Sequence, residues 1–215
     1  MRLHLIRHGQ TASNVIGAID TSVPGPPLNA KGERQAAALA QALGGVRFDR
    51  VVASSQVRAQ MTGAALAHER GIELEVRDGL REVSAGHLEM RTDADAIEQY
   101  LTTIAGWGRG STGAVLPGGE TLDVTLGRFD AVVEELVLDR TEHAAIVSHG
   151  AMIRVWCAMR VHNVDAEFVF SHPLSNTGIV TVERRQDGTW LADRWESAVV
   201  PAPQPTSGPA GQPVA

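Results

Sequence analysis

The stretch LHLIRHG, residues 3–9, decides the fold of this 215-residue chain. Residues 3–7 form a short apolar run that is typical of a buried strand, and Gly9 lies just beyond its end. Strand patterns of the same kind recur further along the chain, at residues 50–54 (RVVAS), 72–76, 143–148 (HAAIVS), 179–184 and 189–195. The last two are predicted to close a hairpin around residues 186–188.

Helical patterns fill the segments between these strands. Asn29 can cap a helix that runs to about Leu43, and Thr92 with Asp95 resembles a capping box for a helix to about residue 104. Further helices are predicted for residues 56–70, 121–138 and 150–159. The alternation of strand and helix predicts an α/β fold with three α/β/α layers, in which helices cover both faces of a mainly parallel central sheet.

The length fits one domain of ordinary enzyme size. We predict a single catalytic domain over residues 1–196, because the composition changes after that point. Residues 197–215 carry no charged side chain, and prolines 201, 203, 205, 209 and 213 crowd them. This proline-rich uncharged stretch is predicted to be a flexible tail, because it cannot bury enough apolar surface to offset the cost of ordering.

The charge balance excludes several classes of protein. With 19 basic and 25 acidic residues the chain has a net charge of −6, so neither nucleic acid nor an anionic membrane is an expected partner. Lys31 is the only lysine, which excludes a P-loop or a kinase lysine elsewhere. Cys157 is the only cysteine, which excludes a disulfide and a cysteine-based zinc site. We expect no metal and no cofactor, and a cytoplasmic protein because no signal-peptide or membrane-span pattern is visible.

Charged side chains collect where three predicted strands end. Arg7 and His8 follow the first strand, Arg58 follows the second after a short turn, and His149-Gly150 ends the strand at 143–148, where a helix begins. In an open α/β sheet ligands bind at the carboxyl ends of the strands, and backbone N–H groups at helix starts attract anions. The pattern therefore predicts a site for a compact anion, and a phosphoryl group fits best.

Six segments, in order, resemble those of a known family. They are LIRHGQTASN (5–14), SSQVRAQMT (54–62), LREVSAG (80–86), PGGET (117–121), VSHG (147–150) and SNT (175–177). The set is similar to the motifs of the histidine phosphatase superfamily, in its phosphoglycerate-mutase-like branch. The resemblance spans about residues 3–195 and implies that family's fold.

The resemblance also implies roles for single residues. His8 would be the nucleophile that becomes phosphohistidine, and Glu82 would be the general acid and base. Arg7, Arg58 and His149 would hold the phosphoryl oxygens, with His149 protonated and Glu82 at the pocket mouth, away from the arginines. The phosphate-binding set would be completed by Asn14, Gln10, Thr11 and Gly150.

The residues around the acid favour hydrolysis. Family mutases carry E-R-H-Y-G at this point, whereas this chain has Glu82-Val83-Ser84-Ala85-Gly86 and lacks that arginine and tyrosine. We therefore expect a metal-independent phosphatase that acts on a small phosphorylated metabolite. The alternatives are a phosphoglycerate mutase and a non-catalytic phospholigand-binding protein. Residues 17–28 and 88–117 would recognise the alcohol part of the substrate, and the resemblance leaves a homodimer open.

Overall fold

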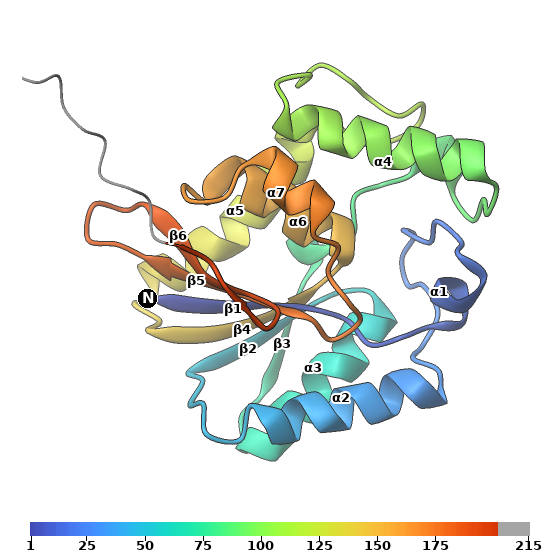
Figure 1. Cartoon of the computed structure of the whole chain (residues 1–215). Helices are drawn as coiled ribbons and strands as arrows, with labels where there is room; N and C mark the ends of the chain where they lie inside the picture. The colour runs from blue at the N-terminus through green and yellow to red at the C-terminus, as the bar shows by residue number, and fades with distance from the viewer. Residues whose placement is uncertain (202–215) are drawn as a thin grey trace, which may run out of the picture.

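Parallel strands form the centre of the fold in a computed structural model that describes residues 1–201 (Figure 1). The seven-stranded sheet has the order β3-β2-β4-β1-β5-β6-β7. β3, β2, β4 and β1 are parallel, and β5, β6 and β7 extend the sheet antiparallel from the other edge of β1. The bounds are β1 Arg2–Arg7, β2 Arg50–Ser54, β3 Leu74–Arg77, β4 His143–Ser148, β5 Ile179–Arg184, β6 Trp190–Trp195 and β7 Ala198–Val199. The predicted fold class is confirmed.

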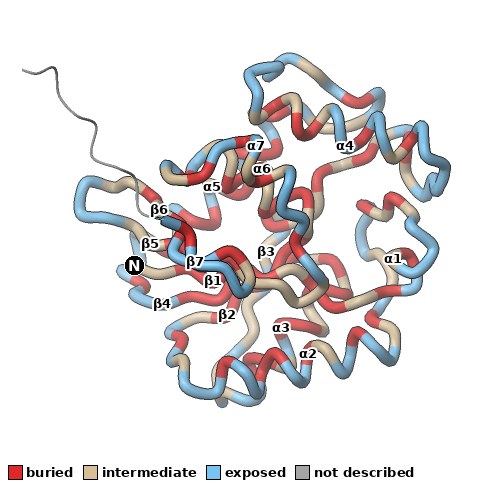
Figure 2. The backbone as a smooth tube through the Cα atoms, in the orientation of Figure 1, coloured by how far each residue is buried: buried red, intermediate tan, exposed pale blue. Residues whose placement is uncertain are grey.

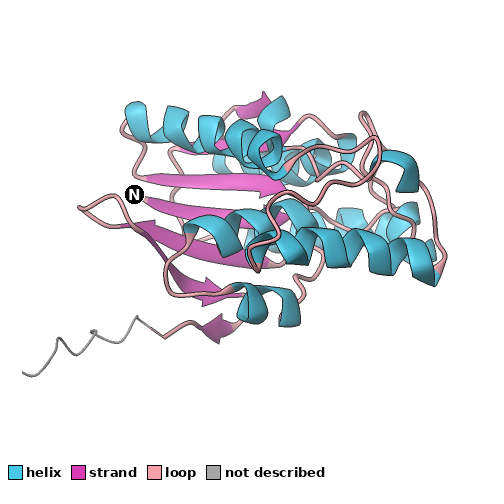
Figure 3. Cartoon of the chain, turned by 90° about the horizontal axis from the view of Figure 1, so that it is seen from above, coloured by secondary structure: helices cyan, strands magenta, loops and turns pink. Residues whose placement is uncertain are grey.

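Helices form the two outer layers of the molecule (Figures 1 and 3). α2 (Ala30–Ala42) and α3 (Val57–Arg70) cover one face of the sheet. The other face carries α4 (Ala94–Gly108), α5 (Leu122–Leu138), α6 (Gly150–Arg160) and α7 (Ala166–Ser171). The short helix α1 (Ala12–Ile16) follows β1, and 3₁₀ turns occupy Asp78–Leu80 and Gly86–Leu88. None of the helices within residues 1–201 is both long and apolar enough to cross a bilayer.

The apolar strands β1 and β4, which were predicted from the sequence, are buried on both faces. Parallel strands in the centre of an α/β sheet have helices on both sides and are therefore covered on both. In β1, Leu3 and Leu5 join the larger core beneath α4–α7, while Ile6 joins the smaller core beneath α2 and α3. Residues of β4 alternate in the same way between the two clusters. Figure 2 shows the central strands β1, β2 and β4 as mostly buried, whereas β3 and β7 at the two edges of the sheet contain no buried residue.

The structure corrects some of the predicted elements. The side chain of Asp93, rather than Thr92, caps α4 by accepting from the N–H of Ala96 at 3.1 Å. β3 begins at Leu74, two residues later than predicted. The helices α1 and α7 were not predicted, because segments of five and six residues are too short to show a helical repeat.

The predicted boundary of the tail also differs from the structure. Ala198 and Val199 form β7 against β6, and Val200 is buried, with its N–H donating to the carbonyl of Asp193. Strand pairing thus orders residues that the composition assigned to the tail. The remainder of the predicted tail, residues 202–215, lies outside the described residues.

Candidate active site

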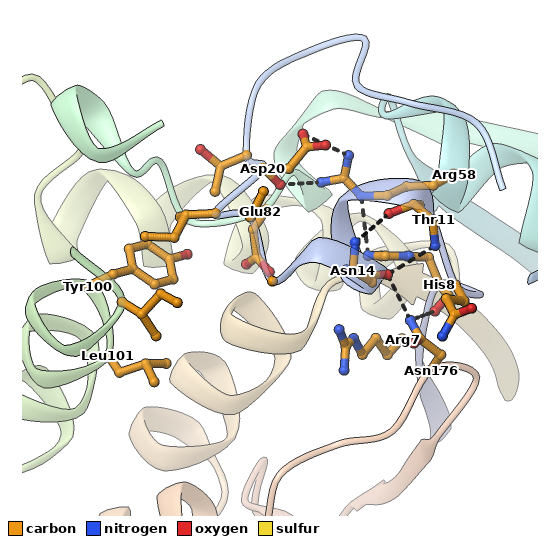
Figure 4. A pocket seen from close by; sticks show the side chains of 16 residues that line it. Arg7, His8, Thr11, Asn14, Asp20, Arg58, Glu82, Tyr100, Leu101 and Asn176 are labelled. Carbon is orange, nitrogen blue, oxygen red and sulfur yellow. Dashed lines mark hydrogen bonds and ion pairs between the residues drawn. The ribbon is translucent and has the colours of Figure 1, made fainter. Parts of the chain in front are cut away.

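A pocket of about 410 Å³ opens at the carboxyl ends of the parallel strands (Figure 4). It brings together Arg7 and His8 from the end of β1 and Arg58 from the first turn of α3. Glu82 lines the same pocket, as do the side chains of Gln10, Thr11, Asn14, Asp20 and Asn176. Side chains from distant parts of the sequence therefore meet where the sequence predicted an anion site.

His8 is held as a neutral imidazole with one nitrogen directed at Arg58. Its Nδ1 lies 2.7 Å from the carbonyl of Gly9, so Nδ1–H donates there and leaves the lone pair on Nε2. Arg58 Nε donates to that Nε2 at 3.2 Å. Burial, together with the charges of Arg58 and Arg7, holds the pKa of His8 well below 6.5. A neutral imidazole with its lone pair at the pocket is the form that can act as a nucleophile.

The two arginines are anchored on their outer sides. Arg58 Nη2 donates to the carbonyl of Asp20 at 2.9 Å, and Arg7 Nη1 donates to the carbonyl of Leu174 at 2.7 Å. Burial lowers the pKa of each guanidinium below its ordinary value, but arginine stays charged at neutral pH. Within residues 1–201, Arg7 Nε and Arg58 Nη1 are buried donors without a hydrogen-bond acceptor. Arg58 Nη1 has the Asp20 carboxylate as an ion-pair partner at 3.5 Å, so Arg7 Nε is the buried donor that suits an anionic ligand.

His149 lies behind His8 at the start of α6, with ring centroids 5.1 Å apart. Its Nε2 is 2.9 Å from the hydroxyl of Ser54, a residue that the sequence analysis did not assign to the site. Burial, followed by the charge of Arg58, holds the pKa of His149 well below 6.5. This lowered pKa favours the neutral ring, whereas the sequence analysis predicts a protonated His149. When Ser54 donates to Nε2, the proton of the neutral ring is on Nδ1, which can still donate.

Glu82 is bound to the start of α6 by backbone donors. One carboxylate oxygen accepts from the N–H groups of Val83 and Met152 at 2.8 Å each, and the other accepts from Ala151 at 3.1 Å. Its own N–H donates to the side chain of Gln56 at 2.9 Å. Donors at a helix N-terminus suit a carboxylate, so this geometry holds a negative side chain at the pocket wall. The charge of Glu82 favours the protonated forms of Arg7 and Arg58, but within residues 1–201 no hydrogen bond or ion pair joins Glu82 to either arginine.

The smaller polar residues build the wall beside His8. Thr11 and Asn14 cap α1 reciprocally: each accepts from the backbone N–H of the other, at 3.1 and 3.2 Å. Asn176 Nδ2 donates to Asn14 Oδ1 at 3.2 Å and to the carbonyl of His8 at 3.1 Å. Gly150 lies against the Arg7 side chain, because a Cβ added there would be 3.3 Å from Arg7 Nε. It is not one of the residues that line the pocket. The SNT segment already contained Asn176, which was not named as a site residue.

Asp20 is a site residue without a sequence signal. Its carboxylate lies 3.5 Å from Arg58 Nη1 and accepts from Ser13 Oγ at 2.5 Å, and the side chain is 7% exposed. A carboxylate beside an anion-binding arginine was not expected from an aspartate in a loop of glycine and proline. Asp20 becomes part of the site because the loop folds over Arg58, where a Cβ on Gly25 would meet Arg58 Nη1 at 2.4 Å.

The loop that contains Asp20 is fastened to the segment after Glu82. The Glu89 carboxylate accepts from the Thr21 N–H at 2.9 Å, from the Thr21 hydroxyl and from the Ser22 N–H at 3.1 Å. Gln56 Nε2 donates to the carbonyls of the same two residues at 3.0 and 2.9 Å. The two regions expected to recognise the substrate are therefore held together. Both contribute to the pocket wall, one through residues 17–21 and the other through Ile97, Tyr100 and Leu101.

The site shows no sign of a metal centre. No group of three or more His, Cys, Asp or Glu side chains in residues 1–201 is arranged to hold a metal ion. Cationic charge at the pocket wall instead comes from two guanidinium groups, those of Arg7 and Arg58.

Comparisons with known proteins agree with this geometry. The family model of the histidine phosphatase superfamily (branch 1) matches residues 3–197. The broad-specificity phosphatase YOR283W of Saccharomyces cerevisiae is 32% identical, over 87% of this chain and 81% of its own length. The PE-PGRS family protein PE_PGRS11 of Mycobacterium tuberculosis is 31% identical over 95% of this chain, which spans only 38% of that protein.

Solved structures agree as well. The mycobacterial glucosyl-3-phosphoglycerate phosphatase Rv2419c, determined with VO3, superposes with a TM-score of 0.77 at 26% identity. The match covers 91% of this chain and 98% of that structure.

Proposed function

The chain belongs to the histidine phosphatase superfamily, and we propose that it is a metal-independent phosphatase that hydrolyses a small phosphomonoester through phosphohistidine at His8. The observation that carries the proposal is the state of His8, a neutral imidazole whose Nε2 meets Arg58 inside a cationic pocket. Relatives named as phosphatases support hydrolysis as the activity.

In the proposed first step, His8 Nε2 attacks phosphorus while the bond from phosphorus to the alcohol oxygen breaks. Arg7 and Arg58 stabilise the charge on the phosphoryl oxygens, and the Nδ1–H of His149 adds a neutral donor. The departing alkoxide needs a proton, and Glu82 is the carboxyl group at the wall that can carry it. For this step Glu82 carries a proton, which comes from solvent before the first turnover and from the attacking water of the preceding cycle thereafter, and its carboxyl group turns from the N–H groups of α6 toward the leaving oxygen.

In the second step, Glu82 accepts a proton from water as the water oxygen attacks the phosphorus of phosphohistidine. The bond from phosphorus to Nε2 breaks, which returns neutral His8 and releases inorganic phosphate. Each proton that Glu82 gives up is regained in this step, so the cycle balances without an external acid or a metal ion.

Hydrolysis is favoured over a mutase reaction by the charge of the pocket wall. A mutase must hold a second anionic group of a bisphosphate, whereas both lining arginines belong to the phosphoryl end. The other charged side chains of the wall, Asp20 and Glu82, are acidic and repel a second anion.

The proposal is tested by trapping phosphate on the protein. After brief incubation with a ³²P-labelled phosphomonoester, acid-labile and base-stable label is expected on His8. His8→Ala should lose both label and turnover, while His68→Ala, at an exposed position of α3, should retain both. Full turnover by His8→Ala would refute the mechanism. A wild-type protein that binds vanadate but turns over no ester would favour the non-catalytic alternative.

A further inference from the structure

We propose that the pocket selects phosphomonoesters whose alcohol part is apolar and uncharged, such as arylalkyl or branched alkyl phosphates. This inference rests on the proposed function, because it assigns a substrate class to the same site. It concerns the outer half of the pocket, which lies beyond the group held by His8 and the arginines.

The outer half of the pocket is lined by apolar groups from two segments. Ala18 and Ile19 come from the loop after α1, and Ile97, Tyr100 and Leu101 come from α4. Figure 4 shows Tyr100 and Leu101 on the side of the pocket away from His8. Positions 97, 100 and 101 are three and four residues apart, so one face of α4 supplies all three side chains.

Tyr100 is a buried residue of this wall, and the proton of its hydroxyl group is not free for a ligand. The hydroxyl donates to the carbonyl of Val83 at 2.9 Å, and the residue is 7% exposed. Leu101 is 41% exposed, and Ile97 is half-buried. An apolar alcohol that enters the pocket would cover the leucine side chain and so remove apolar surface from water.

Carboxylates lie between the two halves of the pocket. Asp20 and Glu82 both line the wall, and Figure 4 places them between the His8 end and the Tyr100 end. A carboxylate or second phosphate on the alcohol part would come close to these two negative groups, in a partly buried site where repulsion is weakly screened. Arg154 of α6 offsets part of the Glu82 charge, but it is not one of the residues that line the wall, and its guanidinium lies 5.4 Å from the ring of Phe170. The wall therefore opposes anionic alcohols and favours apolar ones.

The test compares three primary alkyl phosphates, so that the leaving groups are chemically alike. These are 2-phenylethyl phosphate, glycerol 3-phosphate and 3-phosphoglycerate, which are apolar, polar and anionic in the alcohol part. We expect kcat/KM for the phenylethyl ester to exceed that for glycerol 3-phosphate at least about tenfold. The value for 3-phosphoglycerate is expected to be lower still.

Three variants test the apolar wall, a matched exposed position and the carboxylates separately. Leu101→Gln should lower kcat/KM for the phenylethyl ester about tenfold and leave glycerol 3-phosphate within about twofold. Its inhibition constant for orthovanadate, which occupies only the phosphoryl end, should not change. Leu138→Gln, at a leucine that is 72% exposed on α5, is the matched control and should change neither ester. Asp20→Asn should raise turnover of 3-phosphoglycerate relative to glycerol 3-phosphate.

The outcomes distinguish this inference from the proposed function. If glycerol 3-phosphate or 3-phosphoglycerate is turned over as well as the phenylethyl ester, or if Leu101→Gln slows all three esters alike, the selectivity is refuted while the phosphatase stands. If none of the esters is turned over and no label reaches His8, the proposed function fails, and the inference fails with it.

Discussion

Ser54→Ala tests how His149 is held, because it removes one oxygen atom from behind the imidazole. Both residues are 0% exposed, and the Ser54 hydroxyl lies 2.9 Å from His149 Nε2. The same hydroxyl oxygen accepts from the backbone N–H of Gln56 at 3.3 Å. The alanine keeps the backbone and the Cβ, so the loss is confined to these two hydrogen bonds.

The magnitude follows from the burial of the groups left behind. A buried polar group that loses its partner costs about 1–3 kcal/mol, and the bond to Gln56 is long and contributes less. We expect the free energy of unfolding to fall by about 2 kcal/mol. Without the hydroxyl, the proton of His149 is no longer fixed on Nδ1, so kcat/KM should also fall by about tenfold or more.

Two measurements check this expectation against a matched control. Urea unfolding followed by circular dichroism gives the stability, and initial rates with one phosphomonoester give kcat/KM. Ser55→Ala removes a neighbouring hydroxyl that donates to Asp78 at an exposed position, so it should change stability by less than about 0.5 kcal/mol. Ser54→Thr retains a hydroxyl group and should recover part of the activity. If Ser54→Ala matches Ser55→Ala in both measurements, the hydroxyl does not position His149.

Three further predictions concern the general acid, one buried histidine and two glycines. Glu82→Gln cannot accept from all the α6 N–H groups or supply a proton, so kcat for alkyl phosphates should fall about 10²–10⁴-fold. An aryl phosphate with a good leaving group should lose less, and equal losses in steady-state assays would contradict general acid catalysis. Burial lowers the pKa of His4 to about 4, below the unfolded value of 6.5, so the unfolded chain binds more protons between these values. Stability should therefore fall on acidification below 6.5, with His4 contributing about 1.4 kcal/mol per pH unit down to its folded pKa. Urea titrations at several pH values in this range should show that the free energy of unfolding depends less steeply on pH in His4→Leu. An unchanged dependence on pH would count against the burial effect. Gly32→Ala should lower the melting temperature, because a Cβ there would lie 2.1 Å from the carbonyl oxygen of Gln10, whereas Gly127→Ala in α5 meets nothing within 4 Å and should stabilise by about 0.5–1 kcal/mol. Calorimetry that finds both glycine variants equally stable would contradict the packing.

The sequence predicted the parts of the fold that repeat a pattern. The buried strands β2 and β4 have the predicted bounds, because continuous apolar runs bounded by polar residues leave little choice of register. Arg7, His8 and Arg58 meet at the predicted edge because parallel strands end on the same side of a sheet. These features follow from local periodicity and from the handedness of α/β connections.

The rest depends on contacts between segments that no local pattern reveals. Ser54 ends a strand and appears as an ordinary small residue until His149, far along the chain, packs against it. Burial and the charge of Arg58 lower the pKa of His149, an effect that cannot be judged from its motif alone. Asp20 becomes a site residue only because its loop is fastened by Glu89 and Gln56 over the arginine.

The position of β1 in the sheet has a consequence for synthesis of the protein on the ribosome. β1 is made before the other strands of the sheet, yet its two neighbours are β4 and β5, which lie more than 130 residues later in the chain. Until those strands emerge, the apolar β1 has neither of its sheet partners, and the nascent chain presents an unpaired strand. The sheet therefore has high contact order, and its centre closes only when nearly all of the described chain has been synthesised. Because His8 directly follows β1, catalytic activity should appear late and all at once, and molecular chaperones that bind extended apolar segments would have time to act on this chain.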